Sequence, residues 1–419
     1  MRRVLFLLLS AILAGIFFFA LVRDQMREWV GMQWKFTSTL RKEERKGITG
    51  GIKQVIVKDL NRVDRCTTCH IAIDKPQLEL GEEPYKAHPG KYLQWHPVDK
   101  FGCPVCHGGQ GLATETKAAH GDVAHWEEPL LRGPLVQASC RTCHGDLSAI
   151  AGVAPLLVKG KALFKEKGCY GCHAIKDIGQ TVSVDLSEVG SKSHQLMEAD
   201  FENMPHPHNR IHWMETKLHN PRTLNPGVTQ EHLPLGEEEV FPTAMPNFSL
   251  TDDEAQALTV YLLSLTDANP PVSYTIPPEP ELVPTYDNDV QRGQAVYNRL
   301  GCAGCHGPNG LGGHRNSNNG LGEEVPPLIY VKTYYANHED SLKRLIRNGR
   351  QPAPRMNVNR PNPSLYMPAW KDKMTDSELN ALAAYLFSLS EYLPASVETP
   401  AVEGSTVPAP SETVPTPTN

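Results

Sequence analysis

The chain lacks an excess of positive charge. Its 419 residues include 41 Lys and Arg against 47 Asp and Glu, a formal net charge of −6. Nucleic-acid-binding domains usually carry a basic face, so we expect no nucleic acid among the partners. The chain also lacks any cysteine before Cys66, so no cysteine near the N-terminus is expected to carry a lipid. All ten cysteines lie further along, in one repeated pattern.

In this pattern two cysteines are separated by two residues and followed directly by a histidine. The five copies read CTTCH, CPVCH, CRTCH, CYGCH and CAGCH. They comprise Cys66, Cys69 and His70; Cys103, Cys106 and His107; Cys140, Cys143 and His144; Cys169, Cys172 and His173; and Cys302, Cys305 and His306.

The Cys-x-x-Cys-His pattern predicts covalent attachment of c-type haem. Two cysteines three positions apart lie on one side of a helical turn, so both can bond one porphyrin while the histidine binds its iron. Structural zinc uses two such pairs per ion, and five pairs would leave one over. A redox dithiol or a set of disulfides needs no histidine after each pair. We therefore expect five covalently bound haem c groups.

An uncharged apolar run of 19 residues, 4–22, follows two arginines. It is longer than the roughly 7–15 residues of a signal-peptide core and close to the roughly 20 that span a bilayer. No small-x-small cleavage site follows, so residues 1–23 are predicted to be an uncleaved signal anchor. More basic residues follow this run than precede it, which by the positive-inside rule favours the opposite orientation. Haem attachment outside the cytoplasm overrides that rule and predicts a single-pass protein of the bacterial inner membrane, with its bulk in the periplasm.

A juxtamembrane segment, residues 24–59, carries Trp29 and Trp34. These side chains lie either at the membrane interface or on a helix that contacts a partner subunit.

The first three motifs recur with a fixed period. Cys66, Cys103 and Cys140 are each 37 residues apart, which indicates a duplicated haem-binding unit. We expect residues 60–150 to form a three-haem domain with little regular structure, in which the porphyrins supply much of the apolar interior. Three further histidines would give every iron a second histidine ligand. Four are present: His88, His96, His120 and His125.

The period slightly favours His88 and His125, because each lies 22 residues after the first cysteine of a motif. Which histidine serves which haem stays open at this point.

The last two motifs share a second repeat. The stretches KGKALFKEKGCYGCH and QRGQAVYNRLGCAGCH place glycine, an aromatic residue, glycine and cysteine at the same spacing. Each is followed by an amphipathic helix, at 250–265 and 374–389. Both predicted helices open with a capping box, Thr251 with Glu254 and Thr375 with Glu378.

Residues 155–268 and 288–390 resemble class I cytochrome c domains in these features. The resemblance implies that an N-terminal helix crosses the C-terminal helix through a close contact between glycine and aromatic residues. The residues implied are Gly160, Phe164 and Tyr261 in the first domain and Gly293, Tyr297 and Tyr385 in the second.

The resemblance also implies a methionine as the distal iron ligand of each domain. Met245 and Met367 both stand in a Met-Pro context that is similar to the family's. Histidines between His206 and His219 in the first domain could replace its methionine. The competing methionines are Met197, Met204 and Met214 in the first domain and Met356 and Met374 in the second.

The predicted fold is mainly α with much irregular structure. It comprises an N-terminal transmembrane helix, a haem-packed three-haem domain and two class I cytochrome c helical domains. Residues 269–287 are a proline-rich linker between the last two domains. Residues 391–419 are rich in Pro, Thr, Ser and Val and are expected to be a disordered tail.

If every iron has two protein ligands, no haem is open to a substrate, and the chain transfers electrons without a catalytic site of its own. The alternative is a multihaem oxidoreductase with one open-coordination catalytic haem. Multihaem reductases of the nitrite type are similar in haem count. Their catalytic haem commonly has lysine in place of the motif histidine, and no Cys-x-x-Cys-Lys occurs here. A haem-based sensor would need both an open haem and a signalling domain.

Methionine raises the potential of haem iron relative to histidine, so electrons would enter at the three-haem domain and leave through the cytochrome c domains. Overall the chain resembles membrane-anchored multihaem cytochrome c subunits of respiratory complexes, such as cytochrome bc-type or alternative complex III assemblies. That resemblance implies as partners the membrane, quinol-oxidising subunits, and a periplasmic cytochrome or an oxidase.

Overall fold

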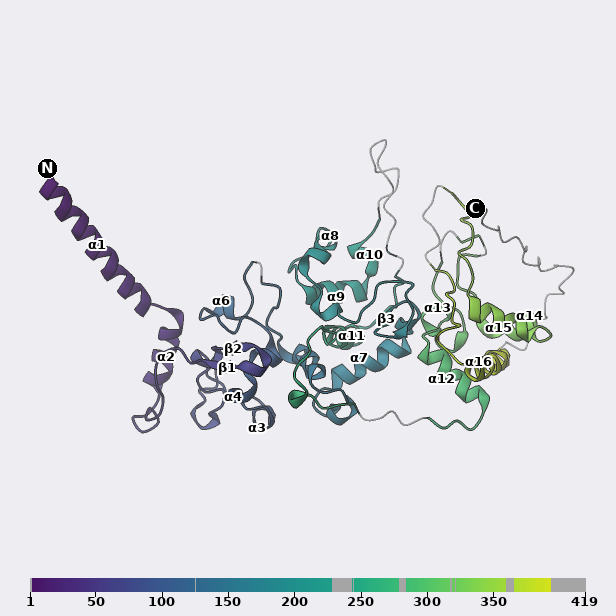
Figure 1. The fold of residues 1–419 in the computed structure, drawn as a ribbon, viewed down its shortest axis with the longest axis horizontal. Helices are drawn as coiled ribbons and strands as arrows, with labels where there is room; N and C mark the ends of the chain where they lie inside the picture. Colours follow the sequence, from purple (N-terminus) through teal and green to yellow (C-terminus); the bar gives the residue numbers. More distant parts are fainter. Residues whose placement is uncertain are drawn as a thin grey trace, which may run out of the picture.

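The protein is an elongated, mainly helical chain with long irregular segments, as the sequence predicts (Figure 1). In Figure 1 the N-terminal helix lies at one end and the second cytochrome-like unit at the other. The computed structural model describes residues 2–124, 126–227, 243, 245–278, 284–316, 319–320, 322–358 and 365–392. The predicted tail beyond residue 392 and residues 279–283 of the predicted linker lie outside this part of the chain.

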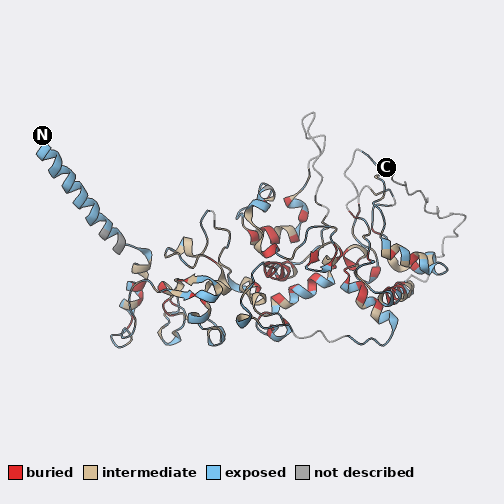
Figure 2. Cartoon of the chain, viewed as in Figure 1, coloured by how far each residue is buried: buried red, intermediate tan, exposed pale blue. Residues whose placement is uncertain are grey.

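Helix α1, Arg2–Gln25, projects away from the remaining elements (Figure 1). Its apolar window Arg2–Ala20 has a mean hydropathy of 2.4 and none of it is buried. Figure 2 shows this apolar window exposed. A helix of this length and composition can cross a membrane, where its leucine and phenylalanine side chains would be removed from water.

The region around the first three motifs is built from very short elements. Strands β1 and β2 form an antiparallel pair in which Val55 lies opposite Asp64. The elements are β1 Val55–Val57, β2 Arg62–Asp64, α3 Tyr92–Trp95, α4 Val98–Phe101, α5 Pro104–His107, α6 Thr116–Ala119 and the 3₁₀ helix η4 Gly133–Thr142.

Helix α2, Glu28–Thr39, packs onto this region. Its Phe36 is fully buried and stacks on Tyr85, with ring centroids 5.4 Å apart. Trp34 is exposed. The predicted juxtamembrane segment therefore packs, through α2, against the region around the first motif.

Around the fourth motif, two long helices form the frame of a cytochrome-like unit, and shorter helices cover one side (Figure 1). Buried positions concentrate on these helices (Figure 2). The elements are α7 Pro155–Glu166, η6 Cys169–Gly171, β3 Ala174–Ile175, β4 Ile178–Gly179, α8 Glu198–Phe201, α9 Arg210–His219, α10 Pro221–Leu224 and α11 Asp252–Leu263.

The unit around the fifth motif repeats this frame with α12 and α16, and α14 and α15 pack beside it (Figure 1). Its helices are α12 Asp289–Arg299, α13 Ala303–His306, α14 Val331–Tyr335, α15 Glu339–Asn348 and α16 Asp376–Ser388.

The predicted helix crossing is confirmed in both units by glycines that allow backbone contact. A Cβ atom at Gly160 would overlap the carbonyl oxygen of Ala257 on α11. A Cβ atom at Gly293 would overlap the carbonyl oxygen of Ala381 on α16 in the same way. Any larger side chain at either position would hold the two helices apart.

Aromatic rings pack beside each glycine contact. Phe164 and Tyr261 have ring centroids 5.5 Å apart, and Tyr297 and Tyr385 have centroids 5.4 Å apart. Edge-on and tilted pairs at this distance add to the burial energy of the helix crossing.

The capping boxes predicted for the last helix of each unit are also confirmed. Thr251 accepts a hydrogen bond from the backbone N–H of Glu254, whose carboxylate accepts one from the N–H of Thr251. Thr375 and Glu378 make the same exchange at the start of α16. These bonds fix where each helix begins.

We expect Gly293→Ala to lower the free energy of unfolding of the haem-loaded protein by about 1–3 kcal/mol, because the added methyl group forces α12 away from α16. Thermal unfolding followed by circular dichroism measures the change. The matched control is Gly31→Ala in α2, where nothing lies within 4 Å of the added Cβ. A glycine-to-alanine change inside an exposed helix is expected to stabilise by about 0.5–1 kcal/mol. A Gly293→Ala protein as stable as the wild type would contradict the close crossing.

Candidate haem sites

Each histidine of the first three motifs faces a second histidine from elsewhere in the chain. In all three cases the ring centroids lie within a narrow range of distances. The pairs are His70 with His120 at 6.5 Å, His107 with His88 at 6.2 Å, and His144 with His96 at 6.2 Å.

These separations fit a metal ion held between two imidazoles. Two metal–nitrogen bonds of about 2 Å, extended by the distance from each nitrogen to its ring centre, place the centroids roughly 6 Å apart. The three pairs therefore have the spacing needed to hold three bis-histidine haem irons.

The pairing does not follow the repeat of 37 residues. His88 lies 22 residues after Cys66, yet it faces His107 of the second motif. The first motif is faced by His120, which follows the second motif in the chain. His125, which the period favoured, lies outside the described residues.

Backbone carbonyls orient three of the motif histidines. In each case Nδ1–H donates to a carbonyl oxygen, which leaves Nε2 without a proton and free to bind iron. The bonds run from His107 to Leu131 at 3.2 Å, from His173 to Val184 at 2.8 Å and from His306 to Pro326 at 3.1 Å.

Burial keeps the motif histidines neutral. Removal from water is the largest effect on the pKa of each ring, and it lowers that pKa below the ordinary value because it disfavours the charged imidazolium. The neutral ring is the form that binds a metal ion. The residues are His70, His107, His144, His173 and His306.

All ten cysteines are described, and all are free and half-buried. Burial raises the pKa of Cys69 and Cys106 to about 11 and that of Cys169 and Cys302 to about 12. These thiols are therefore protonated near neutral pH and available for bonding to the porphyrin.

A buried aspartate joins the first two motifs. Asp64 is fully buried, and its carboxylate accepts a hydrogen bond from the backbone N–H of Cys66 at 2.7 Å and another from that of Cys103. The sulfur atoms of Cys66 and Cys103 and a carboxylate oxygen of Asp64 all lie within 4.8 Å of one another. Asp64 was missed in the sequence, where the one available signal is an acidic residue two positions before a motif.

The second and third motifs are also in contact. Ser139, directly before the third motif, donates its hydroxyl proton to the carbonyl oxygen of Cys106 at 2.6 Å. After burial, the nearby Cys140 thiol is the next contribution to the raised pKa of Cys106.

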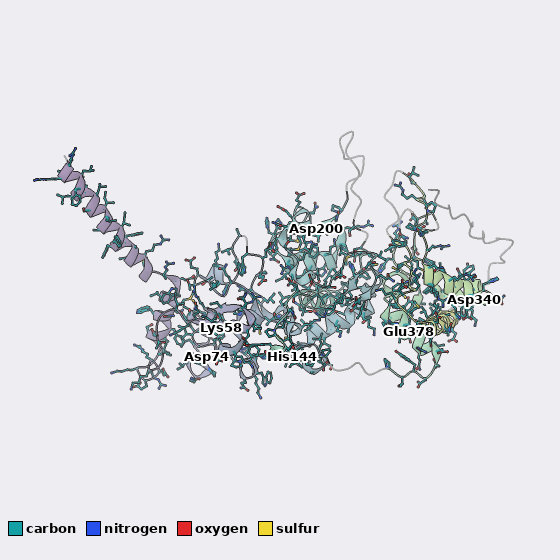
Figure 3. The ribbon with its side chains drawn as sticks, viewed as in Figure 1. Lys58, Asp74, His144, Asp200, Asp340 and Glu378 are labelled. Carbon is teal, nitrogen blue, oxygen red and sulfur yellow. The ribbon has the colours of Figure 1, made fainter. Side chains whose placement is uncertain are left out.

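The third motif lies against the first cytochrome-like unit. Arg141 of this motif donates to the carbonyl oxygen of Ser264 at 3.4 Å. It is also close enough to Tyr170 of the fourth motif to act on its phenol, although burial is the larger effect and raises the pKa of Tyr170. Figure 3 shows His144 at this junction.

The fourth and fifth motifs meet at their glycines, because a Cβ atom at Gly171 would overlap the carbonyl oxygen of Gly301. The Cys172 and Cys305 thiols are close enough for each to shift the pKa of the other. Each motif therefore lies beside the next in chain order.

Helix α2 positions both sides of the first site. Gln33 donates to the carbonyl oxygen of Thr68 inside the first motif at 2.9 Å. Glu28 accepts hydrogen bonds from the backbone N–H and the hydroxyl of Thr116, at 2.7 and 2.6 Å. Thr116 begins α6, which ends beside His120. The sequence did not reveal these roles, because polar residues on a juxtamembrane helix carry no local signal for a distant contact.

The two predicted distal methionines lie against the cores of their units. Met245 packs against the core that includes Met214, and Met367 packs against the core of the second unit, as does Met374. Met356 is exposed. Within the described residues, the buried Nε2 atoms of His194 and His212 have no hydrogen-bond partner. His212 lies within the predicted stretch between His206 and His219 and is therefore an alternative candidate ligand to Met245.

Comparison with known proteins identifies a family. The cytochrome c family profile matches residues 157–266 and 290–390, half of the chain. A Cbb3-type cytochrome c oxidase subunit CcoP from Azospirillum brasilense is 31% identical over 102 residues, 24% of this chain and 28% of the relative. The CcoP subunit from Azospirillum sp. (strain B510) is 26% identical over 140 residues, 33% of this chain and 37% of the relative.

The chain thus matches well under half of the length of these relatives. No solved structure matches it. The family match covers both predicted cytochrome c domains, whose helix crossings are described above. On this basis the chain belongs to the cytochrome c family.

Proposed function

We propose that the protein is a pentahaem cytochrome that conducts electrons along a line of five haems on the periplasmic side of a bacterial inner membrane. The observation that carries this proposal is the close approach of successive attachment motifs, from Cys66 and Cys103 at one end, whose sulfur atoms lie within 4.8 Å, to the glycine contact of Gly171 with Gly301 at the other.

The chain provides two ligands for each iron in this proposal. The motif histidines bind on one side, and His120, His88 and His96 bind on the other side of the first, second and third haems, which the short ring-centroid distances support. Met245 and Met367 complete the fourth and fifth sites. Bound haem supplies an iron that alternates between ferric and ferrous states and so carries one electron.

Filled axial positions favour conduction over catalysis. A substrate must reach the iron directly, and the three facing histidine pairs occupy both sides of the first three sites. The alternative, an oxidoreductase with one open haem, requires one of these second ligands to be absent in the loaded protein.

The ends of the line indicate the partners. With α1 crossing the membrane, the first site lies near the membrane surface. Support comes from α2, which follows α1 and contacts this site through Gln33 and Glu28. A quinol-oxidising membrane subunit is therefore the proposed donor. The similarity to oxidase subunits named CcoP supports a place in a respiratory complex, with a periplasmic cytochrome or an oxidase as acceptor.

The histidine assignment predicts which variants open a haem. We expect five low-spin ferric haems in the EPR spectrum of the oxidised full-length protein. His88→Ala, His96→Ala and His120→Ala should each convert one haem to high spin, because each removes the partner of one motif histidine. His125→Ala is the matched control and should leave all five low-spin. A stoichiometric high-spin haem in the wild type would support the enzyme alternative, and one in His125→Ala would refute the assignment.

The methionine assignment predicts a paired spectral result. Methionine-ligated ferric haem has a near-infrared charge-transfer band. Met367→Leu, which preserves side-chain volume, should remove the part of the band intensity that one haem contributes. Met374→Leu is the matched control, since Met374 packs against the same core. Met245→Leu should remove the intensity that the other haem contributes. Loss of the band in Met374→Leu instead would transfer the ligand role to Met374. If His212 is the ligand of the fourth haem, the wild type shows the band intensity of one haem alone, and His212→Ala converts one haem to high spin.

The direction of electron flow predicts the order of the potentials. In a spectroelectrochemical titration, the two methionine-ligated haems should become reduced at higher potential than the three bis-histidine haems. If they titrate below the other three, electrons do not run from the membrane-proximal sites toward the cytochrome c domains.

A further inference from the structure

The two cytochrome c domains meet through the glycines of their attachment motifs. A Cβ atom at Gly171 would overlap the carbonyl oxygen of Gly301, and one at Gly304 would overlap that of Gly168. Gly168 and Gly301 both precede the first cysteine of a motif, and Gly171 and Gly304 both precede the second. Each domain therefore presents the same two positions to the other, with the roles exchanged.

This exchange is the signature of two-fold symmetry, in which residue i contacts j and j contacts i. The second cysteines agree with it, because Cys172 and Cys305 occupy equivalent positions and their thiols are close enough for each to shift the pKa of the other. The axis thus passes between the two sulfur atoms that would bind the two porphyrins.

A second set of contacts around the glycines is also reciprocal between the two domains. Phe248, three residues after Met245, packs edge-on against His314 of the second domain, with ring centroids 4.8 Å apart. In the opposite direction, Gln180 of the first domain donates to the carbonyl oxygen of Ala369, two residues after Met367, at 3.0 Å. In each case a loop that follows a Met-Pro pair contacts the loop that follows the other domain's attachment motif.

The chain itself shows that haem attachment does not require glycine before the second cysteine. The three-haem region has Thr68, Val105 and Thr142 at this position, whereas the cytochrome c domains have Gly171 and Gly304. Neither of these two glycines has the positive φ that would demand glycine for backbone reasons. Their lack of a side chain is explained by the contact between the domains.

We propose that the two cytochrome c domains form an internal pseudo-two-fold pair, held by these motif glycines, in which the thioether edges of the last two haems meet and are closed to other proteins. The two domains then act as one two-haem unit, and an external acceptor must dock on another face. This inference rests on the proposed haem content and adds the arrangement of the final two sites.

Cross-linking of the haem-loaded full-length protein tests the pairing. Lys373 donates to the carbonyl oxygen of Asp177 at 3.2 Å, which brings it beside Lys176 of the other domain. A short amine-reactive cross-linker should join Lys176 to Lys373 in the wild type, as read by mass spectrometry. Magnetic interaction between the two neighbouring haems should also broaden their EPR signals.

The double variant Gly171→Thr/Gly304→Thr should abolish both the cross-link and the broadening while all five haems remain attached. Gly152→Thr is the matched control, because nothing lies within 4 Å of a Cβ at Gly152. Gln180→Ala is a milder second variant that removes a hydrogen bond between the domains without adding volume, and it should lower the cross-link yield.

The pairing is refuted if the wild type gives no cross-link, or if the yield is unchanged in the double variant. It is also refuted if the double variant loses a haem, since the glycines would then serve attachment. These outcomes differ from failure of the proposed function, which would appear as a high-spin haem in a wild type that still cross-links.

Discussion

Axial coordination is the constraint on which the rest of the proposed arrangement depends. The Cys-x-x-Cys-His motif supplies two thioether bonds and one iron ligand from within a single turn of chain. The second ligand must come from the opposite side of the porphyrin, where the same turn cannot reach. The fold therefore has to bring a distant residue to each motif. Around the first three motifs there is almost no regular structure. Irregular segments there bring His88, His96 and His120 to face histidines of motifs elsewhere in the chain.

Polar side chains support this crossing where an apolar core is small. Asp64 joins two motifs through their backbone N–H groups, and Glu28 and Gln33 of α2 hold both sides of the first site. Buried carboxylates are costly unless their oxygens are hydrogen-bonded, and Asp64 meets that condition with two donors. Burial of the motif histidines lowers the pKa of their rings and keeps them neutral. Desolvation thus favours the ligand state while hydrogen bonds hold the geometry.

Glycine permits close backbone contact at two levels of the structure. Gly160 and Gly293 let the first and last helices of each cytochrome c domain touch. Gly171 and Gly304 let the two domains approach each other at their attachment motifs. The first contact builds a domain, and the second aligns two copies of that domain around a pseudo-two-fold axis. Both rely on the absence of a Cβ atom at a point where backbone atoms of another segment lie within van der Waals distance.

Features with a local physical cause could be predicted from the sequence alone. Two cysteines and a histidine act within one helical turn, and the capping boxes and apolar spacing of α11 and α16 lie within one helix. The apolar composition of α1 is likewise evident from its own residues, without knowledge of any contact. Folding was needed to reveal which histidines face each other, which groups Asp64 and Glu28 bind, and why Gly171 and Gly304 lack side chains. These depend on contacts between residues far apart in the chain, and the repeat of 37 residues does not encode them. His88 illustrates the difference: its spacing from Cys66 is regular, yet the fold places it against His107, because the distal side of a haem is reached through space and not along the chain.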